Sequence, residues 1–493
     1  MRHDYRQWVP RSPRFCARTI RRQNNCSYST RSTDATTQHT TAAVRKPERL
    51  SRTDTGFLAL EDRRGLHMHA GCVLVFDGVA PGLAELTERI AARLDGVPRY
   101  RRQVISTGPF PGRAVWVDAP RLALAGHLRH TALAGAADDA ELAQLAARVF
   151  SAPIDRGKPL WELWLVERLA GERFALISKV HHALVDGEAN RDLLSLLFDA
   201  EAEAPGAARP PASPGTGRGR LLAERLANRP RGTLEQALTL AGRGREELEW
   251  RDLDPLARVG APPRSRLNTP IGRDRRYAWV EVGLGRLRKA KQRLGGTIND
   301  AVLTAVAGAL GHYLRAHGED TDGVVLRALI PLADASSGRL VASFVPLPVG
   351  IEDPRRRHAE ISRALDGLRS SGRAVAVEAL VELDGFAPPS VISQAARLQA
   401  RQRAFNVAVT NIPGPQGTRR LLGRELRAIY PALPLARNQA LSVAVVSYAG
   451  RLCFGLLADS DALEDLDLLA GALEQSLAEL AKGARAKRSR EQR

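Results

Sequence analysis

Two adjacent histidines, His181 and His182, are the residues of this sequence best suited to chemistry. An imidazole can accept a proton and return it near neutral pH. An aspartate four residues on, Asp186, can orient a partner or fix the turn that presents the imidazole, and Gly187 then permits a tight turn. We therefore predict a general-base site that activates a hydroxyl or a thiol, with His182, His181 and Asp186 as candidate catalytic residues.

The segments on either side indicate how these residues are positioned. The apolar run 174–180 precedes the histidines and predicts a strand, and a helix-like segment follows over residues 188–198. Further strands are expected at 72–76 and 114–117, and helices at 83–94 and 139–150. The histidine pair is thus expected at a strand end, where a scaffold can point side chains into a cleft.

A structural histidine and a metal ligand are the alternatives to a proton acceptor. Zinc sites usually need three or four well-spaced ligands, whereas the four cysteines are scattered with no paired spacing. His67 and His69 offer further ligands, but nothing in the sequence demands them. We favour proton transfer and expect no metal.

Several segments together resemble one family. Residues 181–187, HHALVDG, resemble the HHxxxDG motif of the wax ester synthase/diacylglycerol acyltransferase family, a motif shared in looser form with chloramphenicol acetyltransferase-like enzymes and peptide-synthetase condensation domains. The segments that favour the first family are the opening with Asp54, Phe57, Glu61 and 68–71, then Pro159-Leu160-Trp161-Glu162, then 296–303 with Asn299-Asp300, and 406–415. The resemblance covers roughly residues 50–480.

The resemblance implies an α/β (α+β) fold of two chloramphenicol acetyltransferase-like domains with mixed sheets and an active-site channel between them. It makes His182 the general base, with His181 packing or tuning the site and Asp186 fixing the loop through an ion pair. From the residues themselves, Trp161 is expected to pack in the core beside the active strand, and Glu162 can pair with a cation there, with its role left open. Asn299 either lines the channel or holds the second domain. Motif residues expected at or near the site are Gly187, Pro159, Trp161, Glu162, Asn299 and Asp300.

The implied activity is O-acyl transfer from a fatty acyl-CoA to diacylglycerol, to a long-chain alcohol, or to both. No acyl-enzyme is expected, because no activated serine or cysteine accompanies the histidines. Acyl-CoA is a co-substrate, and no other cofactor is expected.

Some positions depart from the family pattern and keep alternatives open. His67 stands where a proline is frequent, residues 331–335 lack a frequent arginine, Ala342-Ser343 stands near a usual Gly-Asn pair, and Ser442 replaces a common asparagine. A condensation-type acyltransferase acting on another alcohol or amine therefore stays open. So does a lipid-binding member of the same fold that has lost turnover.

The formal net charge of +19 raises the question of a nucleic-acid partner. Much of the charge lies in the tails, where no aromatic residues alternate with the cations as in a base-stacking surface. We expect no nucleic-acid partner and leave room for peripheral contact with a membrane or lipid-droplet surface. No apolar stretch is long enough to span a bilayer, and the cysteines form no disulfide framework, so we expect a cytoplasmic protein.

Composition divides the chain into five segments. We expect a disordered basic tail over 1–48, an N-terminal acyltransferase domain over 49–200, a linker with exposed helices over 201–264, a C-terminal acyltransferase-like domain over 265–481 and a basic tail over 482–493.

Overall fold

A computed structural model describes most of residues 48–199 and 262–483. The described residues are 48–50, 54–55, 58, 61, 67–106, 114–119, 122–184, 194, 197–199, 262–333, 340–370, 405–415 and 417–483. They all belong to one compact unit, residues 45–493. Asp186, Gly187, nearly all of the expected linker and most of both tails lie outside them, so the expected domain boundaries stay predictions.

The N-terminal half alternates strands and helices. Its elements are β1 (Glu48–Arg49), β2 (His69–Asp77), α2 (Leu83–Arg93), η1 (Leu94–Gly96), η2 (Pro98–Arg101), β3 (Arg102–Ser106), β4 (Ala114–Asp118), η3 (Leu124–Gly126), β5 (Leu128–Ala137), α3 (Asp139–Ser151), β6 (Trp161–Leu169), β7 (Arg173–His181) and η4 (His182–Leu184). The strands and helices expected from the sequence are present with ends shifted by at most a few residues. The helix expected after the motif lies largely outside the described residues.

The C-terminal half repeats this alternation. Its elements are β8 (Arg275–Gly283), α7 (Leu284–Leu294), α8 (Ile298–Ala316), β9 (Leu326–Ala333), β10 (Leu340–Leu347), α9 (Pro354–Ser370), β11 (Val407–Pro413), β12 (Arg420–Leu421), β13 (Arg424–Ala432), β14 (Leu441–Tyr448), β15 (Arg451–Asp459) and α11 (Leu466–Gly483). No helix in the described part of the chain has the length and apolar character needed to cross a membrane.

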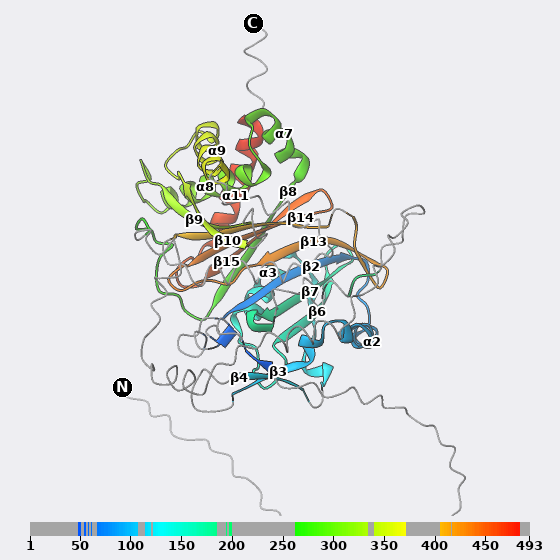
Figure 1. The fold of residues 1–493 in the computed structure, drawn as a ribbon. Coiled ribbons are helices and arrows are strands. Elements are labelled where there is room, and N and C mark those ends of the chain that lie inside the picture. Colours follow the sequence, from blue (N-terminus) through cyan, green and yellow to red (C-terminus); the bar gives the residue numbers. More distant parts are fainter. Residues whose placement is uncertain are drawn as a thin grey trace, which may run out of the picture. The chain divides into compact units, whose positions relative to one another are not determined.

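Two six-stranded mixed sheets form the framework. One has the order β10-β9-β11-β14-β15-β8, with β11 parallel to both β9 and β14. The other has the order β12-β13-β2-β7-β6-β5, with β5 parallel to β6. Helices α7, α8, α9 and α11 gather on one face of the first sheet (Figure 1). The expectation of an α/β fold with mixed sheets is confirmed.

The second sheet is built from both halves of the chain. Strand β13, from the C-terminal half, pairs antiparallel with β2 over residues 71–76, and β2 pairs with β7 along its whole length. Strand β2 is buried at every residue from His69 to Phe76, as expected of a strand covered on both faces. The strand that carries the histidines is therefore two strands away from a segment of the C-terminal half.

Local signals in the sequence explain where the helices begin. Asp138 accepts a hydrogen bond from the Glu141 backbone N–H, and Glu141 accepts one from the Asp138 backbone N–H, which forms a capping box at the start of α3. Thr297 caps α8 by accepting from the Asp300 N–H. Helix α8 is buried along most of its length, as befits the central helix of the C-terminal core.

Candidate active site

The histidine pair lies where β7 ends. His181 is the last residue of β7 and His182 the first of η4, and their exposed fractions are 1% and 0%. The His181 N–H donates to the Leu160 carbonyl at 2.9 Å, and the His182 N–H donates to the Met68 carbonyl at 3.0 Å. The two strands that flank β7 therefore fix the backbone of the motif from both sides.

The hydrogen bonds of His181 define its tautomer. The Ala183 backbone N–H donates to its Nδ1 at 3.0 Å, so Nδ1 is an acceptor. A neutral ring then carries its proton on Nε2, which lies 3.4 Å from Glu61 Oε2. Both ring nitrogens of His181 thus face groups of the protein.

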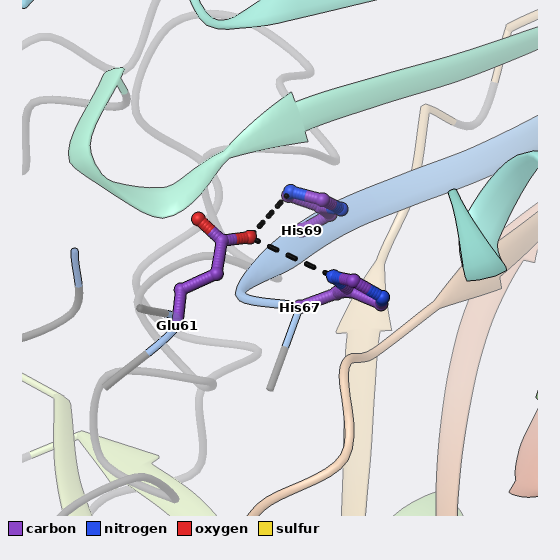
Figure 2. A group of neighbouring side chains, drawn as sticks. All are labelled: Glu61, His67 and His69. Atoms are coloured by element: carbon purple, nitrogen blue, oxygen red, sulfur yellow. Dashed lines mark ion pairs between the residues drawn. The ribbon is translucent and has the colours of Figure 1, made fainter. Parts of the chain in front are cut away.

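Glu61 lies at the centre of a buried group of basic side chains. Its Oε1 lies 3.0 Å from His69 Nε2 and 3.8 Å from His67 Nδ1, as Figure 2 shows. Its Oε2 accepts a hydrogen bond from Arg156 Nη2 at 2.7 Å. Burial opposes the charge of Glu61, but the imidazoles of His181, His67 and His69 that face its two oxygens hold its pKa well below its usual range.

His69 is a buried member of the same group. It lies opposite His181 in the β2–β7 ladder, and its ring stacks on that of His67 with centroids 5.5 Å apart. Burial lowers the pKa of His69 to about 3, although Glu61 acts in the opposite direction. The neutral imidazole is therefore the form present at neutral pH.

The Pro-Leu-Trp-Glu segment forms the start of β6 beside the histidines. The Trp161 N–H donates to the Pro159 carbonyl at 2.8 Å, and Trp161 Nε1 donates to the Tyr100 carbonyl at 2.9 Å. The Trp161 ring stacks on His127 with centroids 4.4 Å apart. Trp161 packs in the core, as expected, and aligns Leu160 with the His181 backbone.

Glu162 pairs with a buried lysine. It lies opposite Lys179 in the β6–β7 ladder, and its Oε2 is 3.3 Å from Lys179 Nζ. Lys179 also donates to the carbonyls of Val149 and Ala152 at the end of α3, where a helix dipole favours a cation. Burial lowers the pKa of Lys179, and Glu162 partly offsets this effect. The cation beside Glu162 is thus Lys179, two residues before His181.

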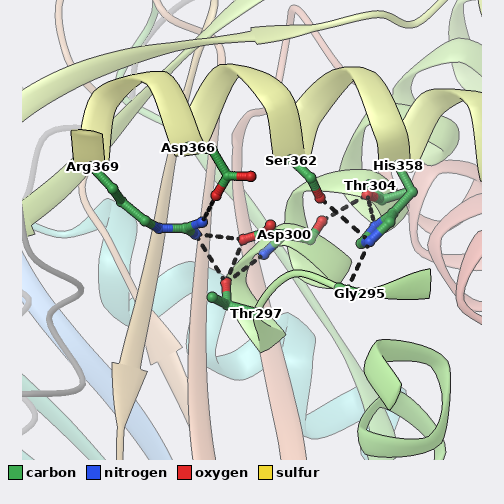
Figure 3. Close-up of polar contacts among 8 residues, drawn as sticks. All are labelled: Gly295, Thr297, Asp300, Thr304, His358, Ser362, Asp366 and Arg369. Atoms are coloured by element: carbon green, nitrogen blue, oxygen red, sulfur yellow. Dashed lines mark hydrogen bonds and ion pairs between the residues drawn. The ribbon is translucent and has the colours of Figure 1, made fainter. Parts of the chain in front are cut away.

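Asp300 of the Asn-Asp segment belongs to a second polar network, in the C-terminal half (Figure 3). Asp300 Oδ1 accepts from Thr297 Oγ1 and, at 2.7 Å, from Arg369 Nη2 of α9. The neighbouring Asn299 is partly exposed. No contact joins Asp300 to His182 among the residues that the structure describes. Asp300 therefore joins α9 to the start of α8 through its contact with Arg369.

The structure brings together only part of the predicted site. His181, His182 and the segment from Pro159 to Glu162 meet at the ends of β6 and β7, whereas Asn299 and Asp300 lie on α8; Asp186 and Gly187 lie outside the described residues. Lys179 and Arg156 were not predicted as site residues from the sequence. Lys179 had a usable signal, since a lysine within a buried apolar strand requires a partner.

Comparisons with known proteins agree with this geometry. A wax ester synthase/diacylglycerol acyltransferase from Marinobacter aquaeolei VT8 superimposes with a TM-score of 0.62 at 25% identity, over 88% of this chain and 99% of that one. The first condensation domain of the CDA synthetase shares the fold, with a TM-score of 0.51 at 17% identity over 89% of this chain and 96% of that one. The fold and the histidine motif together define an acyltransferase built on two six-stranded mixed sheets.

Sequence matches identify the family. Residues 50–302 match the wax ester synthase/diacylglycerol acyltransferase catalytic domain, and residues 339–481 match the C-terminal domain of the same family. The Mycobacterium tuberculosis protein named "Probable diacyglycerol O-acyltransferase tgs1" is 31% identical over 87% of this chain and 95% of that protein. The protein named tgs2 from the same organism is 32% identical over 87% and 97%. The chain belongs to the wax ester synthase/diacylglycerol acyltransferase family.

Proposed function

We propose that this protein transfers a fatty acyl group from acyl-CoA to the hydroxyl of diacylglycerol, of a long-chain alcohol, or of both. The observation that carries the proposal is the buried His181-His182 pair, held at the end of β7 in a chain of this family. The relatives named as diacylglycerol O-acyltransferases support diacylglycerol as an acceptor. The name of the Marinobacter protein supports a wax ester as a second product.

His182 is the proposed general base. Both ring nitrogens of His181 face Ala183 and Glu61, which favours the second histidine for proton transfer. His182 takes the proton of the acceptor hydroxyl while its oxygen attacks the thioester carbonyl. The tetrahedral oxyanion then collapses, the C–S bond breaks, and the departing CoA thiolate recovers the proton from His182. The reaction passes through no acyl-enzyme and requires no cofactor beyond acyl-CoA.

Purified protein supplied with radiolabelled palmitoyl-CoA, with diacylglycerol and hexadecanol offered in parallel, tests the reaction and the acceptor. His182→Ala should lower turnover by about 10²–10⁴-fold, the usual contribution of a general base, while circular dichroism and the melting temperature stay near those of the unsubstituted protein. His181→Ala should lower turnover less. His130→Ala is the matched control, since His130 lies on the surface of β5 with 41% of its side chain exposed. Near-normal turnover by a folded His182→Ala protein would falsify the mechanism.

We also propose that the protein meets anionic lipid surfaces peripherally. The first fifty residues hold eleven Lys and Arg against Asp4, Asp34 and Glu48, and each basic residue at such a surface contributes about 1 kcal/mol to binding. Removing residues 1–45 should weaken binding to anionic vesicles at low salt and leave turnover on detergent-dispersed substrate unchanged. Added salt should abolish the difference, because screening acts first on exposed charges. Equal vesicle binding by both proteins at low salt contradicts this role.

A further inference from the structure

Three buried side chains before the histidine motif present ligand atoms to one point. Glu61 Oε1, one nitrogen of His67 and one of His69 all lie within 4.8 Å of one another. Their side chains are only 9%, 7% and 2% exposed. We propose that Glu61, His67 and His69 form a binding site for one transition-metal ion, of which Zn²⁺ fits best. The proposal does not depend on the proposed acyl transfer.

The distances suit a single ion. Zinc binds nitrogen and oxygen at about 2.0–2.2 Å, so two ligands of a tetrahedral site lie about 3.4 Å apart. The distances from Glu61 Oε1 fall on either side of that value, at 3.0 Å to His69 Nε2 and 3.8 Å to His67 Nδ1. Figure 2 shows this carboxylate oxygen directed at both imidazoles, which lie one beside the other. An ion between the three needs only small side-chain movements.

The same atoms lack regular hydrogen bonds in the described part of the structure. Both ring nitrogens of His67, both of His69 and Oε1 of Glu61 are buried, and no hydrogen bond of regular geometry reaches them from a described residue, although Oε1 lies 3.0 Å from His69 Nε2. Each buried polar group left without a partner costs about 1–3 kcal/mol, and native structures contain few of them. An ion bound by Oε1 and by one nitrogen of each imidazole would engage three of these five atoms, which favours a bound ion at this point.

The surroundings hold the carboxylate in the orientation that a ligand requires. Arg156 Nη2 donates to Glu61 Oε2 at 2.7 Å and to the Leu58 carbonyl at 3.0 Å. His181, protonated on Nε2, faces the same Oε2, so it supports the cluster and is not itself a ligand. Hydrogen-bond partners of this kind orient the side chains that ligate the metal in metal sites. They leave Oε1 directed at His67 and His69.

The ligand types point to zinc and to an open position. Two imidazoles and one carboxylate are a common zinc-binding set, and three protein ligands leave the fourth position to water or to another oxygen. From the sequence alone, proton transfer was favoured over a metal, because the proximity of Glu61 to both histidines arises only in the fold.

Metal content tests the proposal directly. Untagged protein should be incubated with a small excess of ZnSO₄, desalted and measured by mass spectrometry for zinc per chain. We expect one zinc per chain in the unsubstituted protein, and a loss of at least ten-fold in affinity for Glu61→Gln and His67→Gln. His130→Gln should keep the full amount, because His130 belongs to a surface pair with Glu167 at 2.9 Å.

Two further measurements on the unsubstituted protein decide the matter if a variant does not fold. Zinc should raise the melting temperature and EDTA should reverse the rise, because an ion bound only to the folded state stabilises it. X-ray absorption at the zinc edge should show two imidazoles and no sulfur. The proposal is overturned if no zinc remains after desalting, if His67→Gln binds zinc as tightly as the unsubstituted protein, or if the ion is bound through cysteine sulfur.

Discussion

At the scale of single residues, Lys179 is a buried charge next to the proposed catalytic pair. Its side chain is fully buried, and three oxygens surround its Nζ: Glu162 Oε2 and the carbonyls of Val149 and Ala152. The lysine therefore joins β7, β6 and the end of α3 at one point. Because His181 follows two residues later on the same strand, this junction also fixes the direction in which the strand ends.

Glu162→Gln should remove the only carboxylate that the described structure places against Lys179 and leave a buried charge poorly compensated. Loss of one partner from a buried pair costs about 3–5 kcal/mol; the 13% exposure of Glu162 places the expected loss near the lower value. Urea unfolding at pH 7 measures this change. The double variant Glu162→Gln/Lys179→Met should recover part of the stability.

Glu167→Gln is the matched control for this prediction, since Glu167 lies on the same strand and pairs at the surface with His130 at 2.9 Å. Exposed pairs contribute about 0–1 kcal/mol. Equal losses for Glu162→Gln and Glu167→Gln would show that Lys179 does not depend on its carboxylate.

At the scale of elements, α8 and α9 are joined by a buried carboxylate, in addition to the hydrogen bonds of Thr304 with His358 and Arg357. Asp300 is fully buried, and Arg369 of α9 reaches it with 28% of its side chain exposed. Burial opposes the charge, but hydrogen bonds from Thr297 and Arg369 hold the pKa of Asp300 below 3.8. A depressed carboxyl pKa contributes stability above the unfolded value, and that contribution is lost as the pH falls through the folded pKa.

Asp300→Asn should therefore lower the free energy of unfolding by about 3 kcal/mol at pH 7, as expected for a broken buried pair. The difference from the unsubstituted protein should stay constant down to about pH 5 and shrink below about pH 4. Urea titrations across this range measure it. Asp366→Asn is the control, because Asp366 contacts the same Arg369 at 2.7 Å but is 68% exposed. A loss for Asp366→Asn as large as that for Asp300→Asn contradicts the assignment.

Helices and strands that are marked by signals within their own residues were predicted well from the sequence. The apolar run before His181 forms β7, and the capping residues Asp138 and Glu141 begin α3 where expected. Contacts between distant segments were not predicted. The pairing of Glu162 with Lys179 depends on the β6–β7 register, and the Asp300–Arg369 contact joins residues 69 positions apart. Neither contact leaves a periodic pattern in the sequence. The resemblance therefore named Asp300 without a role and left Asn299 with two alternative roles.

At the scale of the whole molecule, the two halves of the chain share structure. Strand β13 completes the sheet that carries the histidine motif. The core around β2 and β7 also takes side chains from the C-terminal half, among them Phe405, Ile429 and Val446. The first half alone would expose β2 as a long apolar edge strand, which is a site of aggregation.

A fragment of residues 49–264 should therefore fail to fold by itself. Near-ultraviolet circular dichroism should show no fixed tertiary structure, and most of the fragment should aggregate. Co-expression with a fragment of residues 265–493 should restore a soluble complex that elutes near the position of the intact chain. Cooperative unfolding of the first fragment alone, with the urea midpoint of the intact protein, would show that β13 is not needed.

The pairing of β13 with β2 also has a consequence during synthesis on the ribosome. Val79 and Arg424, which form a hydrogen bond beside this pairing, are separated by 345 positions. At about 5–20 residues per second, roughly 20–70 seconds pass between the emergence of the two strands. For that time the nascent chain carries an apolar strand with no neighbour on one side. Yield in the cell is thus expected to depend on chaperones that bind nascent chains, and slower translation of the second half should increase aggregation.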